Sequence, residues 1–171
     1  MLFTWLFGET SERAPTASDE LRRLCALSMP GADEHSVAIV GAVAGLLATV
    51  AHADRNYTEA ERDAVRDALL KVHGLEPGSL KSIEELLQEH IAELAHEPLQ
   101  AYTRVLYEGL ERNARLEVFE VLVDLAAADE ALDMQETNLL RRIARAIGLS
   151  DDEYVASQQR HRQRLSVLRE P

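Results

Sequence analysis

Residues 46–72 read LLATVAHADRNYTEAERDAVRDALLKV, and residues 121–147 repeat the pattern as VLVDLAAADEALDMQETNLLRRIARAI. The two stretches align at a constant offset of 75 residues. Identical pairs at this offset include Leu47 and Leu122, Ala51 and Ala126, Ala53 and Ala128, Asp54 and Asp129, Glu61 and Glu136, and Arg66 and Arg141. Such a repeat predicts two similar units that pack around a shared core with a pseudo-twofold relation.

Apolar residues recur every three or four positions along the chain, which is the spacing of one buried helical face. Examples are Val40, Val43, Leu47 and Val50, then Leu80, Ile83, Leu87, Ile91 and Leu94, and later Leu140, Ile143 and Ile147. The small residues Ala44, Gly45 and Ala48 predict that another helix approaches this part of the chain closely. We therefore predict an all-α, single multihelical domain of about eight helices, built on a duplicated helix–loop–helix unit.

Capping signals give the expected ends of the helical domain. Ser18 is predicted to cap a first helix over residues 19–28, which Pro30 ends. Ser150 to Glu153 has the pattern of a capping box that opens the last helix. The predicted organisation is an apolar N-terminal segment and flexible linker (1–17), the helical domain (18–160) and a basic C-terminal tail (161–171).

The composition indicates an acidic protein with a reduced thiol. The 171 residues carry a formal net charge of −12 and one cysteine, Cys25, which we expect to be buried and inert. An acidic surface disfavours nucleic acid and suits cations or basic partners. We therefore expect a cytoplasmic protein with a protein partner and no nucleic-acid ligand.

Residues 1–7, MLFTWLF, are apolar but much shorter than the roughly 20 residues of a membrane span. Two interpretations of this segment stay open. In the first, Phe3, Trp5 and Phe7 fold back into a groove of the helical body. In the second, the segment contacts a partner or a membrane surface and places the protein at the periphery of the inner membrane.

Each repeat contains an acidic loop of the form Ala-x-Ala-Asp, followed after three residues by Thr/Asp-x-x-Glu. Glu61 and Glu136 end these patterns and are typical of capping boxes. Asp54 and Asp129 each follow a predicted helix, where the helix dipole disfavours an anion. Loop N–H groups or a divalent cation would offset that cost.

The combination of these stretches resembles the TerB-like family of tellurite-resistance proteins, in particular its proteobacterial branch. The resemblance covers residues 36–160 and includes Leu99-Gln-Ala-Tyr-Thr-Arg-Val-Leu106, Ala126-Ala-Ala-Asp129 and Leu139-Leu-Arg-Arg-Ile143. A related helical domain occurs in the N-terminal part of a membrane-anchored DnaJ-type co-chaperone. The resemblance implies a small duplicated helical fold with a link to metal or oxyanion stress.

The resemblance also implies a metal site at the acidic loops, formed by Asp129, Asp133, Glu136, Asp54 and Glu61. Family loops usually read Ala-Asp-Gly, whereas Arg55 and Glu130 replace that glycine here. Because Arg55 brings a positive charge beside Asp54, the second loop is the better candidate for a divalent cation, the one cofactor we consider.

The sequence contains no glycine-rich phosphate loop, nucleophile elbow or zinc-type cysteine pair. We therefore expect a non-enzymatic interaction module that presents an acidic surface to a partner or divalent cation. The alternatives are a metal-dependent enzyme that uses the duplicated carboxylates, and a peripheral membrane adaptor tethered by residues 1–7.

Overall fold

The computed structural model describes residues 15–53, 58–70, 77–128 and 134–169, and these ranges fold into eight α-helices without a strand. The helices are α1 (Ala17–Ser28), α2 (Glu34–Ala51), α3 (Glu59–Leu70), α4 (Pro77–His96), α5 (Leu99–Gly109), α6 (Arg112–Ala126), α7 (Met134–Ala146) and α8 (Asp151–Arg169). The prediction of an all-α single domain of about eight helices is confirmed. The duplicated unit with its pseudo-twofold relation stays a prediction.

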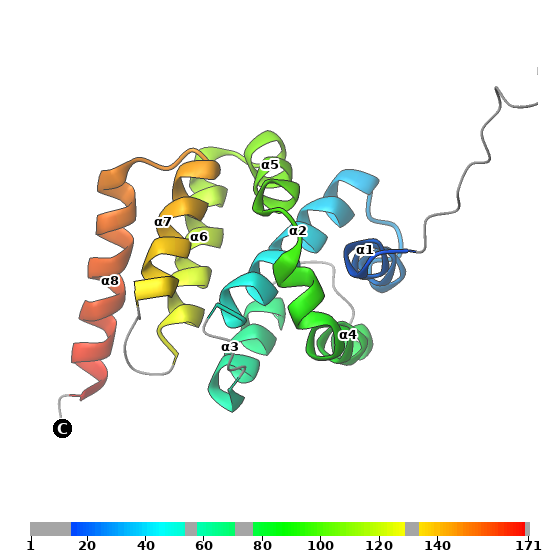
Figure 1. Ribbon diagram of the computed structural model, residues 1–171, viewed down its shortest axis with the longest axis horizontal. Helices are drawn as coiled ribbons and strands as arrows, with labels where there is room; N and C mark the ends of the chain where they lie inside the picture. The colour runs from blue at the N-terminus through cyan, green and yellow to red at the C-terminus, as the bar shows by residue number, and fades with distance from the viewer. Residues whose placement is uncertain (1–14, 54–57, 71–76, 129–133, 170–171) are drawn as a thin grey trace, which may run out of the picture.

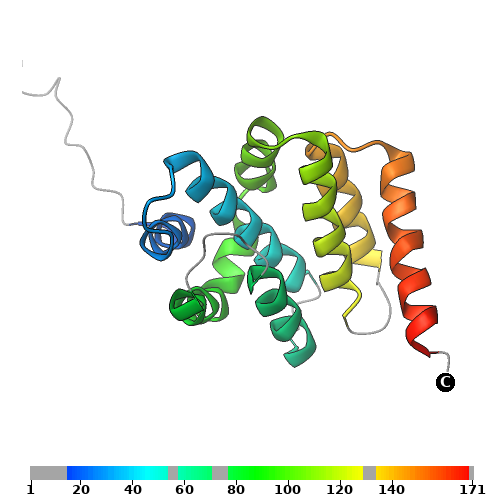
Figure 2. The same ribbon diagram turned by 180° about the vertical axis from the view of Figure 1, so that it is seen from behind.

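Helix α2 runs through the middle of the molecule (Figures 1 and 2). It packs against α1, α4, α5 and α6, while α8 lies at the far end beside α6 and α7. By length and composition alone α2 could cross a membrane, but 67% of it is buried inside the protein. We therefore interpret α2 as the central helix of the hydrophobic core.

Small residues on α2 allow α5 to come close, as the sequence predicts. A Cβ atom added to Gly45 would lie 2.3 Å from Cε1 of Tyr102 on α5. The Tyr102 hydroxyl donates a hydrogen bond to the carbonyl oxygen of Leu94 at 3.1 Å. Burial raises the pKa of Tyr102 to about 12, with a smaller contribution from the charge of Glu97. The phenol is therefore a fixed structural group of the core.

The start of α1 differs from the prediction. Its N-cap is Thr16, whose Oγ1 accepts a hydrogen bond from the N–H of Asp19 at 3.2 Å. The Asp19 carboxylate in turn accepts from the N–H of Thr16 at 2.9 Å. Ser18 lies inside the helix and donates to Glu97 at 3.2 Å. The prediction that Ser18 caps α1 is wrong, because Thr16 and Asp19 form a reciprocal box that Ser18 cannot form.

Helix α8 starts where the sequence predicts. Glu153 accepts from the N–H of Ser150 at 2.7 Å, and the N–H of Glu153 donates to Ser150 Oγ at 3.3 Å. The helix then continues to Arg169, so most of the basic segment 161–171 extends α8.

Candidate functional site

The two acidic loops lie between helices that the structure describes, although Asp54, Asp129 and Asp133 themselves lie outside the described residues. Helix α2 ends before the first loop, and α6 ends before the second. The described parts of the predicted metal site are therefore the flanking helix ends, Glu61 and Glu136.

The helices before the two loops end with the same backbone hydrogen bonds. At the end of α2, the N–H of His52 donates to Ala48 and that of Ala53 donates to Val50, both at 3.1 Å. The equivalent residues of α6, 75 positions later, repeat these bonds: Ala127 to Val123 at 3.1 Å and Ala128 to Leu125 at 3.0 Å. The chain thus leaves both helices in the same way.

The glutamates after the loops also occupy matching positions. Glu61 and Glu136 are the third residues of α3 and α7, and their exposed fractions are only 4% and 8%. Apolar residues one turn further, Val65 and Leu140, are 1% and 0% exposed. The repeat therefore places two carboxylates at the edge of the core in equivalent helical turns.

Glu61 closes the predicted capping box. Its Oε2 accepts hydrogen bonds from the N–H of Thr58 at 2.8 Å and from the Thr58 hydroxyl at 3.0 Å. The N–H of Glu61 contacts Thr58 Oγ1 at 3.2 Å. A cation at this loop would compete with the helix cap for this oxygen. The corresponding box of the second loop begins at Asp133, outside the described residues.

Within the described ranges, no group of three histidine, cysteine or carboxylate side chains is placed to hold a metal ion. One pairing that the sequence did not reveal lies near the first loop, where the ring centroids of His52 and His96 are 6.3 Å apart. His52 is the C-cap of α2 and His96 is the last residue of α4, so their sequence spacing gave no signal. Glu93 of α4 pairs with His90 at 3.2 Å.

Exposed acidic residues form two stripes on the neighbouring helices α3 and α4. The α3 stripe comprises Glu59, Asp63 and Asp67, and the α4 stripe comprises Glu85, Glu89 and Glu93. The α3 stripe has four-residue spacing and follows one side of its helix, as do Glu85 and Glu89 on α4. Glu93 lies beyond a kink of α4 at His90, whose φ and ψ are −117° and 17°. The two helices contain eight acids against three arginine or lysine residues. We call these six side chains the acidic surface.

An arginine joins the two acidic helices. Arg66 of α3 binds Glu84 of α4 at 2.7 Å and Asp63 at 3.3 Å. The hydrogen bond and charge of Glu84 raise the pKa of Arg66. Arg66 thus contacts one residue of the acidic surface, Asp63. Two further residues of this surface have partners on α4: Glu85 lies 3.6 Å from Lys81, and Glu93 lies 3.2 Å from His90.

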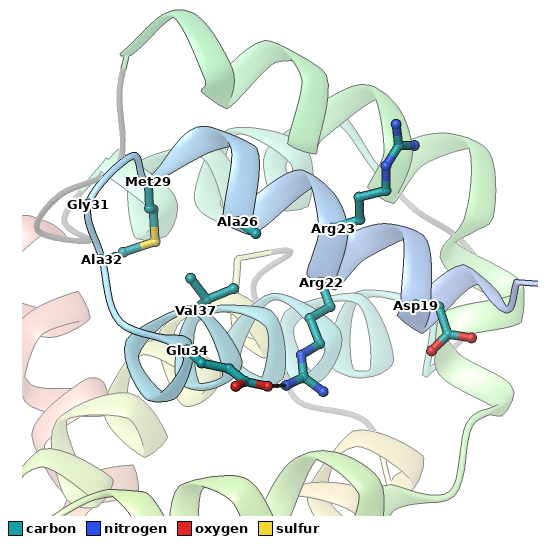
Figure 3. A pocket seen from close by; sticks show the side chains of 9 residues that line it. All are labelled: Asp19, Arg22, Arg23, Ala26, Met29, Gly31, Ala32, Glu34 and Val37. Atoms are coloured by element: carbon teal, nitrogen blue, oxygen red, sulfur yellow. Dashed lines mark hydrogen bonds and ion pairs between the residues drawn. The ribbon is translucent and has the colours of Figure 1, made fainter.

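A hollow of about 590 Å³ lies between α1 and α2 (Figure 3). Its apolar residues include Ala26, Met29, Ala32 and Val37. Arg22 of α1 and Glu34 of α2 meet across it at 2.8 Å. The sequence did not predict this hollow, because it depends on how α1 and α2 pack.

A second, smaller hollow of about 160 Å³ continues along the same two helices and reaches α5. It shares Asp19 and Arg22 with the first hollow. Its other lining residues are mostly small or apolar: Ser18, Leu21, Ala38, Gly41, Ala42, Ala101, Tyr102 and Val105. We call the two together the α1–α2 groove.

Cys25 does not contribute to any of these features. Its side chain is fully buried, and burial raises the pKa of its thiol to about 11. The prediction of a buried thiol is confirmed, and a thiol with such a pKa is a poor nucleophile.

A comparison with protein-family models identifies the family of the chain. The model of the tellurite resistance protein TerB matches residues 41–159, more than half of the chain. The chain belongs to the TerB family. This match confirms the predicted resemblance to TerB, while the relation to the DnaJ-type co-chaperone stays a prediction.

The TerB match covers both repeats and the acidic surface, and the family is generally non-enzymatic. The match begins inside α2, so α1 and the first hollow of the α1–α2 groove precede it. Neither a curated protein nor a solved structure matches the chain significantly.

Proposed function

We propose that this TerB-family protein is a non-enzymatic interaction module whose acidic surface on α3 and α4 binds a basic protein partner. The observation that carries the proposal is the pair of exposed carboxylate stripes at four-residue spacing. We also propose a cytoplasmic setting and a role in metal or oxyanion stress, which the match to the tellurite resistance protein TerB supports.

The uneven distribution of charge over the helices supports the acidic surface as the binding site for a basic partner. Helices α3 and α4 are acidic, whereas α7 carries three arginines against one acid. A basic ligand approaching the molecule is therefore attracted towards the α3–α4 side. Because the carboxylates are exposed, binding should weaken as salt increases.

The experiment is a titration with an oligo-arginine peptide, measured by calorimetry. The test variant carries Glu85→Gln, Glu89→Gln and Glu93→Gln. Exposed ion pairs contribute roughly 0.2–1 kcal/mol each, so affinity should fall by about 1–2 kcal/mol, or roughly five- to thirtyfold.

The matched control carries Glu108→Gln, Glu111→Gln and Glu117→Gln, three exposed glutamates of the α5–α6 region. Each triple variant raises the formal net charge from −12 to −9, because three acids are removed. The control should keep most of the affinity. Equal losses in both variants would show that only net charge matters and would reject this surface.

We further propose that the second acidic loop binds a divalent cation through Asp129, Asp133 and Glu136, with Asp54 and Glu61 as the weaker equivalent set. The matching hydrogen bonds at the ends of α2 and α6 support two equivalent loops. In the first loop, Arg55 follows Asp54 in the sequence and brings a positive charge beside it. This difference favours the second loop.

This site is tested by thermal-shift titration with calcium, magnesium, manganese and zinc. A cation at 100 times its dissociation constant stabilises the folded state by about 2.7 kcal/mol. We expect a shift in the wild type that Asp129→Asn removes and Asp54→Asn largely keeps. No shift with any ion, or an equal shift in wild type and Asp129→Asn, would reject the site.

A further inference from the structure

The two hollows of the α1–α2 groove share Asp19 and Arg22, and the Arg22–Glu34 ion pair spans the first hollow. One end of the groove lies at the connection between α1 and α2, near Met29 and Gly31, and the other lies at Ser18, where α5 borders it. Figure 3 shows Asp19 and Gly31 at opposite ends of the first hollow. An elongated groove of this kind suits a short stretch of polypeptide better than a compact small molecule.

The chain supplies an apolar segment next to one end of this groove. Residues 1–7 contain two of the three phenylalanines and the only tryptophan of the protein. The described chain begins at residue 15, immediately before α1. We propose that the α1–α2 groove is the docking site for the chain's own N-terminal apolar segment, residues 1–7.

The connecting residues are long enough for this contact. Residues 8–14 span up to about 23–25 Å when extended, at 3.3–3.6 Å per residue. The twelve residues of α1 correspond to a helix of about 18 Å at 1.5 Å per residue. The segment can therefore turn back at Pro15 and reach any point along α1.

The sizes of the two surfaces are complementary. Small side chains, among them Ala26, Ala38 and Ala101, line part of the groove, and the segment offers Phe3, Trp5 and Phe7. Charged side chains also border the first hollow: Asp19, Arg22, Arg23 and Glu34. Gly41 adds further room, since a Cβ atom there would meet only the Cα of Arg22, at 3.9 Å. Aromatic side chains bury about 150–250 Å² each, so three of them in water would leave a large apolar area exposed.

Trp5 is a built-in reporter of the proposed contact, because no other tryptophan contributes to the fluorescence. In the full-length protein we expect a blue-shifted emission and several-fold less quenching by acrylamide than in a synthetic peptide of residues 1–14. Both properties should be independent of protein concentration, since the contact is within one chain.

Two variants block the groove at different points. Ala26→Glu places a long charged side chain in the first hollow, and Ala101→Glu does so at the α5 border. Both alanines are exposed, and a glutamate at the third residue of α5 is favourable to the helix dipole, so the fold should persist by circular dichroism. In each variant, the emission wavelength and the acrylamide quenching of Trp5 should approach the values of the peptide. Ala92→Glu, an exposed alanine of α4 outside the groove, should not.

Four results would overturn the proposal. If acrylamide quenches Trp5 as strongly as it does in the free peptide, residues 1–7 do not dock. Shielding that increases with protein concentration would indicate contact with a second copy. Shielding that appears only with phosphatidylglycerol vesicles would indicate membrane contact. Shielding that survives both groove variants would place the segment elsewhere on the protein.

Discussion

At the scale of single residues, two glycines of α2 have opposite environments. A Cβ atom at Gly45 would overlap the ring of Tyr102, whereas one at Gly41 has ordinary van der Waals contact at 3.9 Å. The Tyr102 ring cannot move away easily, because it is buried and its hydroxyl is bonded to Leu94. The same substitution should therefore have opposite effects at the two positions.

We predict that Gly45→Ala lowers the free energy of unfolding by about 1–3 kcal/mol through overpacking. Gly41→Ala should raise it by up to about 1 kcal/mol, since alanine is the better helix former. Urea denaturation of the two variants measures both values. Equal stabilisation by both substitutions would contradict the close contact between α2 and α5.

A second prediction concerns the pH dependence of Glu153. Arg112 holds this carboxylate with two hydrogen bonds of 2.8 Å, and Ser150 adds a third through its N–H. These contacts, Arg112 first, lower the pKa of Glu153 from 4.5 to about 2. Because the pKa is lower in the folded state, the stabilisation is complete above about pH 4.5 and is lost as the pH falls towards 2.

Glu153→Gln should therefore be less stable than the wild type at neutral pH, and the difference should shrink as the pH falls towards 2. Urea denaturation at several pH values measures the difference in unfolding free energy. Glu117→Gln, an exposed residue of α6, serves as the control and should change stability little. A difference for Glu153→Gln that is the same at all pH values would contradict the proposed pair.

At the scale of the helices, α8 is held to α6 by polar contacts and by one aromatic residue. Arg160 pairs with Glu120, and His161 pairs with Asp124 at 2.8 Å. Tyr154 is 4% exposed, and its ring lies 5.9 Å from that of Phe119. We expect the tyrosine to contribute most, because partly exposed ion pairs contribute little to stability.

Tyr154→Ala should lower the free energy of unfolding by about 3–5 kcal/mol, the range for removing a buried aromatic ring. Val155→Ala, on the exposed side of the same helix, should change it by less than about 0.5 kcal/mol. Chemical denaturation gives both values, and hydrogen exchange shows whether α8 opens first. A small effect of Tyr154→Ala would mean that the ion pairs hold α8.

The helices could be predicted from the sequence because their signals are local. Buried residues such as Val65 and Leu69 recur at helical spacing, and the capping boxes at Thr58 and Ser150 are read within four residues. The cap of α1 was also readable, because Asp19 stands three residues after Thr16, the spacing of a capping box, whereas Leu21 stands three residues after Ser18.

The candidate sites were only partly predictable, because they depend on contacts between distant residues. Arg66 and Glu84, which join the two acidic helices, are 18 residues apart. The α1–α2 groove likewise results from packing between helices. For the metal site, the sequence gives the residue types in the loops but not their positions in space. The roles of Asp54, Asp129 and Asp133 as metal ligands therefore stay predictions.

At the scale of the whole molecule, the proposed functions lie in different regions. Helix α1, which borders the α1–α2 groove, lies at one end of the molecule, and α8 lies at the other (Figure 1). The acidic surface belongs to α3 and α4, within the part that matches TerB. Occupation of the groove by residues 1–7 and binding at the acidic surface can therefore be tested separately.

The most direct test of the proposed function is a nuclear magnetic resonance titration of the ¹⁵N-labelled protein with an oligo-arginine peptide. We predict that the largest chemical-shift changes fall on α3 and α4, around Glu59 to Asp67 and Glu85 to Glu93. These changes should diminish as salt increases. Changes spread evenly over all acidic residues, or concentrated on α5 to α8, would contradict the assignment of α3 and α4 as the binding surface.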